Sequence, residues 1–259
     1  MSELIQQEDH GPAIVGVLLR RAERRNALSV ELLEALCATV ERLAATQSCR
    51  VLILRGDGPV FSAGLDLCEA MEETLVERSA GAVDRALNLL RDSRLVTIAA
   101  VHGGAFAGGA GLMAACDLAI AAENARIGFP EVRRGLVPAL ICGVLRTKVR
   151  DGDLRDLFLT GEAVTAERAR QLGLVQRVVP SESLLEESLQ VARSIVAGGP
   201  EAIRATKQLL ASEFAAPPEV LPRSLRDWHL RFRRSDEARE GLRAFLEKRA
   251  PNWDLARQP

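Results

Sequence analysis

The amino-acid sequence predicts an α/β protein that ends in a separate helical region. Two observations indicate this fold class. Short apolar runs typical of buried strands alternate with segments of helical periodicity through about the first two thirds of the 259 residues. From Leu145 onward, strand patterns become rare and helical patterns dominate. We therefore expect a β/α core over residues 1–195 and a helical C-terminal region over residues 196–259.

The first elements follow from local patterns. Two short runs, 4–7 and 13–19, flank a His10-Gly11 turn and predict a β-hairpin. Ser29 is a candidate N-cap for a helix. The apolar positions of that helix recur at helical spacing: Leu32, Leu33, Leu36, Val40 and Leu43. The apolar run between Arg50 and Arg55 predicts a strand that is buried on both faces.

The later elements are predicted in the same way. An acidic segment with glutamates at 69, 72, 73 and 77 leads to a helix expected around Val83–Leu90. Further strands are expected at 95–101, 126–129 and 174–179. Ser235, followed by two acidic residues, is a predicted N-cap of the last helix.

Composition excludes several classes of function. Apolar residues make up 47% and charged residues 27%, and the net charge of −1 offers no field that would attract nucleic acid. No apolar run reaches the roughly 18 residues of a membrane span, and the acidic N-terminus does not resemble a signal peptide. The five cysteines are scattered and odd in number, which indicates reduced thiols. The three histidines are far apart in sequence and lack the spacing of a zinc site, so no metal site is expected. We expect a cytoplasmic protein with neither nucleic-acid nor membrane partners.

Two glycine-containing turns follow two successive predicted strands. The stretch 101–111 holds five glycines between a strand and a small-residue helix, and 61–67 forms a similar turn. Alone, the first stretch is equally typical of tight packing and of an anion site at a helix N-terminus. Together, the turns would present two backbone N–H groups near adjacent strand ends. Two converging donors form an oxyanion hole, which stabilises a thioester enolate or a tetrahedral intermediate.

Four motifs occur in order along the chain: Arg25-Asn26-Ala27-Leu28-Ser29, Phe61-Ser62-Ala63-Gly64-Leu65-Asp66-Leu67, the glycine-rich stretch from Gly103 with Ala115-Cys116-Asp117-Leu118, and Pro130-Glu131-Val132-Arg133-Arg134-Gly135-Leu136-Val137-Pro138. In this order and spacing they resemble the enoyl-CoA hydratase/isomerase (crotonase) superfamily. The resemblance continues to the terminal 245–249 and implies a crotonase-like β-β-α superhelix core with a C-terminal helical trimerisation region.

The resemblance implies the following site. The backbone N–H groups of Leu65 and Gly108 would form the oxyanion hole, and the substrate would be an acyl-CoA thioester. Coenzyme A would enter as part of the substrate, so no separate cofactor is expected. Asp66 is interpreted first as the cap of the following helix. The implied substrate and coenzyme A contacts are Arg25, with Arg24 beside it, Ala27, Ala63, Asp66, Leu67, Cys68 and Lys248.

The position of the catalytic acids is where the sequence departs from the family pattern. Hydratases of this family use two glutamates to move the protons of water. The second of these positions is Glu131, whereas the first is Gly111, which has no side chain. One of the four glutamates of the acidic segment could replace the missing acid.

Several functions remain open after this departure. The leading prediction is hydration of an enoyl-CoA by Glu131 alone, with branched and carboxylated acyl chains among the candidates. The alternatives are a Δ3,Δ2-enoyl-CoA isomerase, an acyl-CoA decarboxylase and a non-catalytic acyl-CoA-binding homologue. Arg133 and Arg134 are either solvated or pair with a carboxylate of the substrate. The resemblance also implies a homotrimer or a dimer of trimers.

Overall fold

The computed structural model describes residues 4–11, 13–213 and 229–253. The chain forms two compact units, residues 1–192 and 193–259, and each is described by itself. Within the described residues, no helix is long and apolar enough to cross a membrane.

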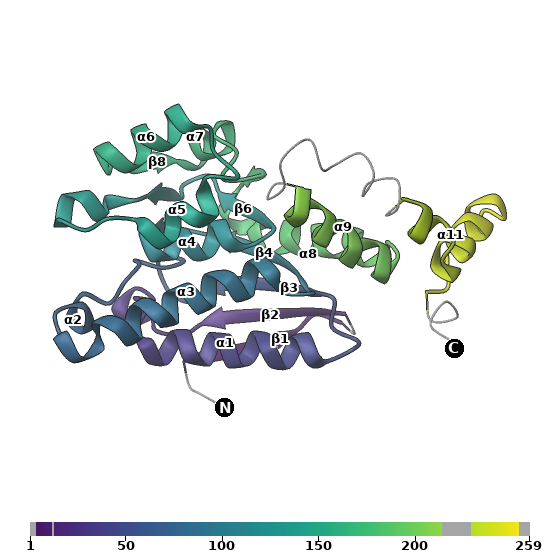
Figure 1. Cartoon of the computed structure of the whole chain (residues 1–259), viewed down its shortest axis with the longest axis horizontal. Helices are drawn as coiled ribbons and strands as arrows, with labels where there is room; N and C mark the ends of the chain where they lie inside the picture. Colours follow the sequence, from purple (N-terminus) through teal and green to yellow (C-terminus); the bar gives the residue numbers. More distant parts are fainter. Residues whose placement is uncertain (1–3, 12, 214–228, 254–259) are drawn as a thin grey trace. The chain divides into compact units, whose positions relative to one another are not determined.

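A six-stranded sheet forms the centre of the first unit (Figure 1). β1 and β2 pair as the predicted antiparallel hairpin, and every later strand in the sheet is parallel to its neighbour. The middle strands are apolar and buried on both faces, as expected for a parallel sheet covered on both sides. The order across the sheet is β1 (Ile5–Asp9), β2 (Ile14–Leu19), β3 (Val51–Gly56), β4 (Val96–Val101), β6 (Leu118–Ala122) and β9 (Arg177–Val179).

A second, smaller sheet lies beyond the carboxyl end of β4. Its order is β5 (Gly104–Phe106), β7 (Arg126–Gly128) and β8 (Val164–Thr165). β5 arises from the glycine-rich stretch and leads directly into a helix. The sequence patterns predicted β7 but neither β5 nor β8, because runs of two or three residues carry too little periodicity.

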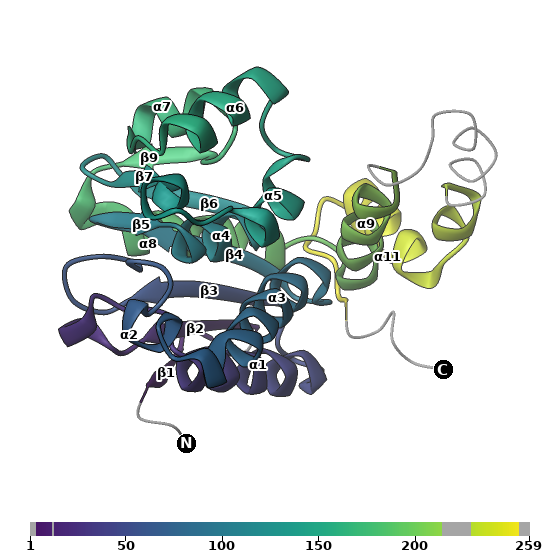
Figure 2. The ribbon, with the colours of Figure 1, turned by 60° about the vertical axis from the view of Figure 1, so that its left-hand side comes forward.

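Helices surround the sheets of the first unit. α1 and α3 run side by side and pack their apolar faces inward (Figure 2). The helices are α1 (Val30–Ala45), α2 (Leu67–Ala70), α3 (Val76–Asp92), α4 (Gly108–Ala115), α5 (Ala139–Leu145), α6 (Asp151–Thr160), α7 (Ala166–Gln171) and α8 (Leu184–Val196). Short 3-10 turns are η1 (Ala22–Arg24), η2 (Glu73–Leu75), η3 (Pro130–Arg134) and η4 (Ser181–Ser183).

The predicted start of α1 is confirmed. Ser29 accepts a hydrogen bond from the Leu32 amide at 3.2 Å, which satisfies one of the free N–H groups at the helix start. The prediction for α3 was too short. The helix begins at Val76, seven residues before the expected Val83, so the end of the acidic segment belongs to its first turn.

The second unit contains α9 (Pro200–Glu213) and α11 (Asp236–Leu246). Ser235 caps α11 as predicted, by accepting from the Ala238 amide at 3.1 Å. Glu237 is buried, and its carboxylate accepts from the amides of Glu201 and Ala202 at 2.9 and 2.7 Å. One helix therefore supplies the N-terminal cap of the other.

Candidate active site

The first glycine turn follows β3, and its backbone conformation requires a glycine at position 64. Gly64 has a φ of +90°, which favours glycine, and a Cβ there would lie 2.5 Å from the Phe106 carbonyl oxygen. The flanking hydrogen bonds run from the Leu28 amide to Gly64 and from the Asp66 amide to Leu28. The amide of Leu65, between them, has no acceptor within the described part of the chain.

The second glycine turn starts α4. Ala107 precedes the helix with a φ of +48°, and its carbonyl accepts a hydrogen bond from the Gly111 amide. Gly108 is the first residue of the helix, so its N–H belongs to the group that a helix leaves unpaired at its N-terminus. Like the Leu65 amide, the Gly108 amide has no hydrogen-bond acceptor among residues 4–11, 13–213 and 229–253.

The two free amides lie close together. A Cβ placed on Gly108 would be 3.9 Å from the nitrogen of Leu65, and one placed on Gly64 would be 3.3 Å from the nitrogen of Gly108. Two unpaired N–H donors at this separation provide a region of positive potential that can hold one oxygen carrying negative charge.

These amides border a cavity of about 580 Å³ in the first unit. The structure brings together there almost every residue that the family resemblance implied. Those that line the cavity are Arg24, Arg25, Ala27, Ala63, Leu65, Asp66, Leu67, Cys68, Gly108 and Glu131. Lys248 lies in the other unit, just past α11, so its contact with coenzyme A stays a prediction.

Glu131 lies in η3 and its side chain lines the cavity. The residue is 8% exposed, and its Oε2 has no hydrogen-bond partner within the described residues. Burial raises the pKa of the Glu131 carboxyl above its ordinary value, and a backbone hydrogen bond and the charge of Arg134 offset part of this rise. A buried carboxyl with one free oxygen and a raised pKa is suited to accept and return a proton.

Gly111 does not line the cavity. A Cβ at this position would meet Ile141 Cγ1 at 3.1 Å and Leu87 Cδ2 at 3.4 Å. The direction in which a side chain would project is therefore occupied by apolar atoms of α5 and α3.

Only one other carboxylate lines the cavity in the described residues, that of Asp66. Its Oδ1 caps α2 by accepting from the Cys68 amide at 2.9 Å, as predicted, and its Oδ2 accepts from the Arg21 guanidinium. Burial alone would raise the pKa of Asp66, but these hydrogen bonds outweigh burial and lower it. Asp66 therefore stays ionised and engaged, and it is not a second proton carrier.

The acidic segment does not supply that second acid in this structure. Glu69 accepts from the Val30 amide at 2.8 Å and so stabilises the N-terminus of α1. The other three glutamates of the segment, at 72, 73 and 77, are absent from the cavity wall.

Two parts of the cavity wall were not predicted from the sequence. One wall is a face of α3 that contributes Val76, Ala80 and Val83, and the other is the segment 136–141 after η3. The spacing of the α3 residues, four and three positions apart, was a readable helical signal. The wall after η3 gave no such signal because it is only partly helical.

The two arginines that follow Glu131 differ in their surroundings. Arg133 donates to the Thr160 carbonyl at 2.9 Å and pairs with Glu162 at 3.4 Å, away from the cavity. Arg134 lines the cavity and forms no ion pair with any described carboxylate.

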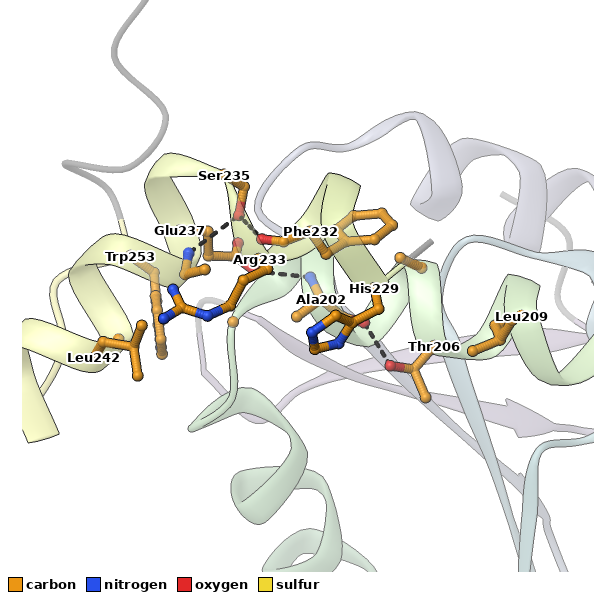
Figure 3. A pocket seen from close by; sticks show the side chains of 14 residues that line it. Ala202, Thr206, Leu209, His229, Phe232, Arg233, Ser235, Glu237, Leu242 and Trp253 are labelled. Atoms are coloured by element: carbon orange, nitrogen blue, oxygen red, sulfur yellow. Dashed lines mark hydrogen bonds between the residues drawn. The ribbon is translucent and has the colours of Figure 1, made fainter. Parts of the chain in front are cut away.

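A second cavity, also about 580 Å³, lies within the C-terminal unit (Figure 3). Most of its polar side chains form hydrogen bonds with backbone groups. Glu237 caps α9, Ser235 caps α11, and Thr206 donates to the Ala202 carbonyl. Across the described ranges, no group of three or more His, Cys, Asp or Glu side chains could hold a metal ion. The cavity with Glu131 is therefore the candidate active site.

Fold and cavity together define an α/β protein in which two neighbouring free amides and a buried acid line one cavity. The model of the enoyl-CoA hydratase/isomerase family matches residues 9–256, and the chain belongs to this family. A relative from Thermus thermophilus is 39% identical, with 96% of this chain and 100% of the relative covered. The 2,3-dehydroadipyl-CoA hydratase of Escherichia coli is 32% identical, with 98% and 99% covered.

Solved structures agree with the fold. The enoyl-CoA hydratase of Mycobacterium smegmatis superimposes with a TM-score of 0.92 at 31% identity, covering 98% of this chain and 100% of that one. The predicted crotonase-like α/β fold is thus confirmed.

Proposed function

We propose that this protein hydrates the double bond of a 2-enoyl-CoA with Glu131 as its single catalytic acid and base. One observation carries the proposal: the free amides of Leu65 and Gly108 line the same cavity as the unpaired Oε2 of Glu131. The amides would accept the thioester oxygen, and the carboxylate would act on the adjacent carbons. That several relatives are named as hydratases supports the same reaction.

The proposed reaction balances with one carboxylate. Water adds its oxygen to the β-carbon while Glu131 takes one of its protons, and the electrons of the double bond move to the thioester oxygen. The resulting enolate oxygen is stabilised by the two amides, each of which contributes about 3–4 kcal/mol in comparable sites. Glu131 then returns the proton to the α-carbon, and the carboxylate is regenerated.

Coenzyme A would be bound as part of the substrate and not as a separate cofactor. Arg24 and Arg25 line the cavity and form no ion pair with a described carboxylate, so both guanidiniums are available to phosphate groups. Ala27 and Ala63 line the same part of the wall and have no bulky side chain to exclude an adenine ring.

Arg134 favours an acyl group that carries a carboxylate of its own. It lies in η3 three residues after Glu131 and lines the cavity, whereas the neighbouring Arg133 is hydrogen-bonded elsewhere. Adipic acid is a dicarboxylic acid, so the name of the Escherichia coli relative is consistent with such a substrate. The apolar wall at 136–141 would contact the methylene groups between the two ends.

The single acid also supports a second candidate, a Δ3,Δ2-enoyl-CoA isomerase. In that reaction Glu131 would remove a proton from the α-carbon and return it to the γ-carbon, without water. The two reactions are separated by offering matched 2-enoyl-CoA and 3-enoyl-CoA substrates. A hydratase consumes the first and forms a 3-hydroxyacyl-CoA, whereas an isomerase converts the second and forms no hydroxyl product.

A homotrimer, or a dimer of trimers, is proposed for the assembly on the family resemblance. α11 exposes Leu242, Phe245 and Leu246, at 45%, 81% and 79%, which supports an additional contact surface in the second unit. Sedimentation analysis would test it, and a monomer at micromolar concentration would contradict it.

A further inference from the structure

Ser62 connects the two halves of the proposed oxyanion hole through its backbone. Its amide donates to the Gly104 carbonyl at 3.2 Å, and its carbonyl accepts from the Phe106 amide at 3.0 Å. These bonds form an isolated parallel bridge between Ser62 and Ala105. The approach to the first turn is thereby fixed against β5, the strand that leads into the second turn.

The side chain of Ser62 holds the first turn. Its Oγ donates to the Asn26 carbonyl at 2.7 Å and accepts from the Gly64 amide at 3.2 Å. Asn26 is itself fully buried and donates to the Val60 and Phe61 carbonyls at 2.9 and 3.2 Å. The residue before Leu65 is therefore tied through Ser62 to a rigid polar network.

The same side chain supports the second turn by contact. A Cβ on Gly109 would lie 2.7 Å from the Cβ, the carbonyl oxygen and the Oγ of Ser62. The first turn of α4 therefore rests directly on Ser62, which is fully buried. Gly109 has no side chain, and this allows the close approach.

We propose that Ser62 is a positioning residue that sets the separation of the Leu65 and Gly108 amides. The inference rests on the proposed function of those amides as an oxyanion hole. Loss of Oγ would leave the Gly64 amide and the Asn26 carbonyl without this shared partner, and would loosen the contact with Gly109. A small shift of either amide away from the developing charge then lowers the rate more than it lowers binding.

The test compares Ser62→Ala and Ser62→Cys with Ser188→Ala. Ser188 is an equally buried serine in α8, and its Oγ donates to the Leu184 carbonyl at 2.7 Å. The first readout is steady-state kinetics. Ser62→Ala is expected to lower kcat about 10- to 100-fold with little change in KM, whereas Ser188→Ala keeps both values.

The second readout is the absorbance of a bound aryl-conjugated 2-enoyl-CoA. Hydrogen bonds to its carbonyl move the absorbance maximum to longer wavelength. We expect the full shift for wild type and Ser188→Ala, a smaller one for Ser62→Cys, which keeps a weak donor and acceptor, and the smallest for Ser62→Ala. If Ser62→Ala does not fold, Ser62→Cys carries the comparison.

One outcome would contradict the positioning role of Ser62, and another would contradict the oxyanion hole itself. A full shift and an unchanged kcat in the folded Ser62 variants would overturn the positioning role while the oxyanion hole stands. No shift in wild type with the probe bound would overturn the oxyanion hole, and with it the proposed function.

Discussion

Ile141 occupies the space into which a side chain at Gly111 would project, because a Cβ at position 111 would lie 3.1 Å from Ile141 Cγ1. The position at which family hydratases carry their first acid is therefore closed by apolar packing. The proposed single-acid chemistry would follow from the way α4, α5 and α3 fit together, and not from the loss of one side chain alone.

Restoring a glutamate at position 111 should therefore not restore a second acid. Gly111→Glu is expected to lower the free energy of unfolding by about 1–3 kcal/mol, because the new side chain must displace Ile141 and Leu87. Activity should fall or stay unchanged. The matched control is Gly143→Glu, at a position where a Cβ meets nothing within 4 Å. A stable Gly111→Glu variant with higher turnover would show that the site accepts the second acid.

Removal of the charge at position 131 should abolish turnover while substrate binding persists. Glu131→Gln keeps the shape of the side chain but cannot accept a proton, so kcat/KM should fall about 10²- to 10⁴-fold. Binding of a CoA ester, followed by titration calorimetry, should change little. Equal, negligible turnover of both forms, with binding intact, would instead identify a non-catalytic acyl-CoA-binding protein.

The pH dependence of activity should reflect the raised pKa of Glu131. The carboxylate is the form that accepts a proton from water, so kcat/KM should fall as pH decreases through a pKa above the ordinary glutamate value of 4.5. A rate profile of wild type between about pH 4 and pH 8 measures this limb. An activity that stays level down to the ordinary pKa would contradict a buried, proton-carrying Glu131.

The same raised pKa predicts a difference in stability between wild type and Glu131→Gln. The folded protein binds this proton more tightly than the unfolded chain does. The free energy of unfolding contributed by Glu131 therefore falls as pH rises from 4.5 through the raised pKa. Glu131→Gln should be the more stable form above that range, and the two should converge below it. Urea unfolding at several pH values measures the difference, and a constant difference would contradict the linkage.

Arg134 should determine preference for a carboxylated acyl chain. Arg134→Gln is expected to lower kcat/KM for a 2-enoyl-CoA with a terminal carboxylate about 10- to 100-fold, since one charge-assisted contact contributes about 1.5–3 kcal/mol. The rate with an uncharged chain of equal length should change much less. Arg133→Gln, whose guanidinium contacts Thr160 and Glu162, is the control and should affect both substrates equally. The same loss with both chains would argue against carboxylate recognition.

Local signals predicted the elements that carry strong periodicity or a clear cap. The Ser29 cap of α1, the buried strand β3 and the Ser235 cap of α11 follow from short patterns that tertiary contacts did not override. The start of α3 was missed because the acidic segment runs into its first turn, and the helical spacing of Val76, Ala80 and Val83 was not recognised beside it.

The site was predicted as a set of residues but not as a shape. Glycine spacing indicated both turns, and the resemblance placed Leu65, Gly108 and Glu131 in one site. Two features of the site depend on contacts between segments that are distant in sequence. One is the packing of Ile141 against Gly111, and the other is the difference between the partners of Arg133 and Arg134. No local pattern encodes such contacts.

The most direct test of single-acid hydration is the reaction of a 2-enoyl-CoA in water enriched in ¹⁸O, with products weighed by mass spectrometry. Wild type should form a 3-hydroxyacyl-CoA that carries one solvent oxygen, and Glu131→Gln should form almost none. Wild type that yields no such product from 2-enoyl-CoA substrates, with or without a terminal carboxylate, would contradict the account.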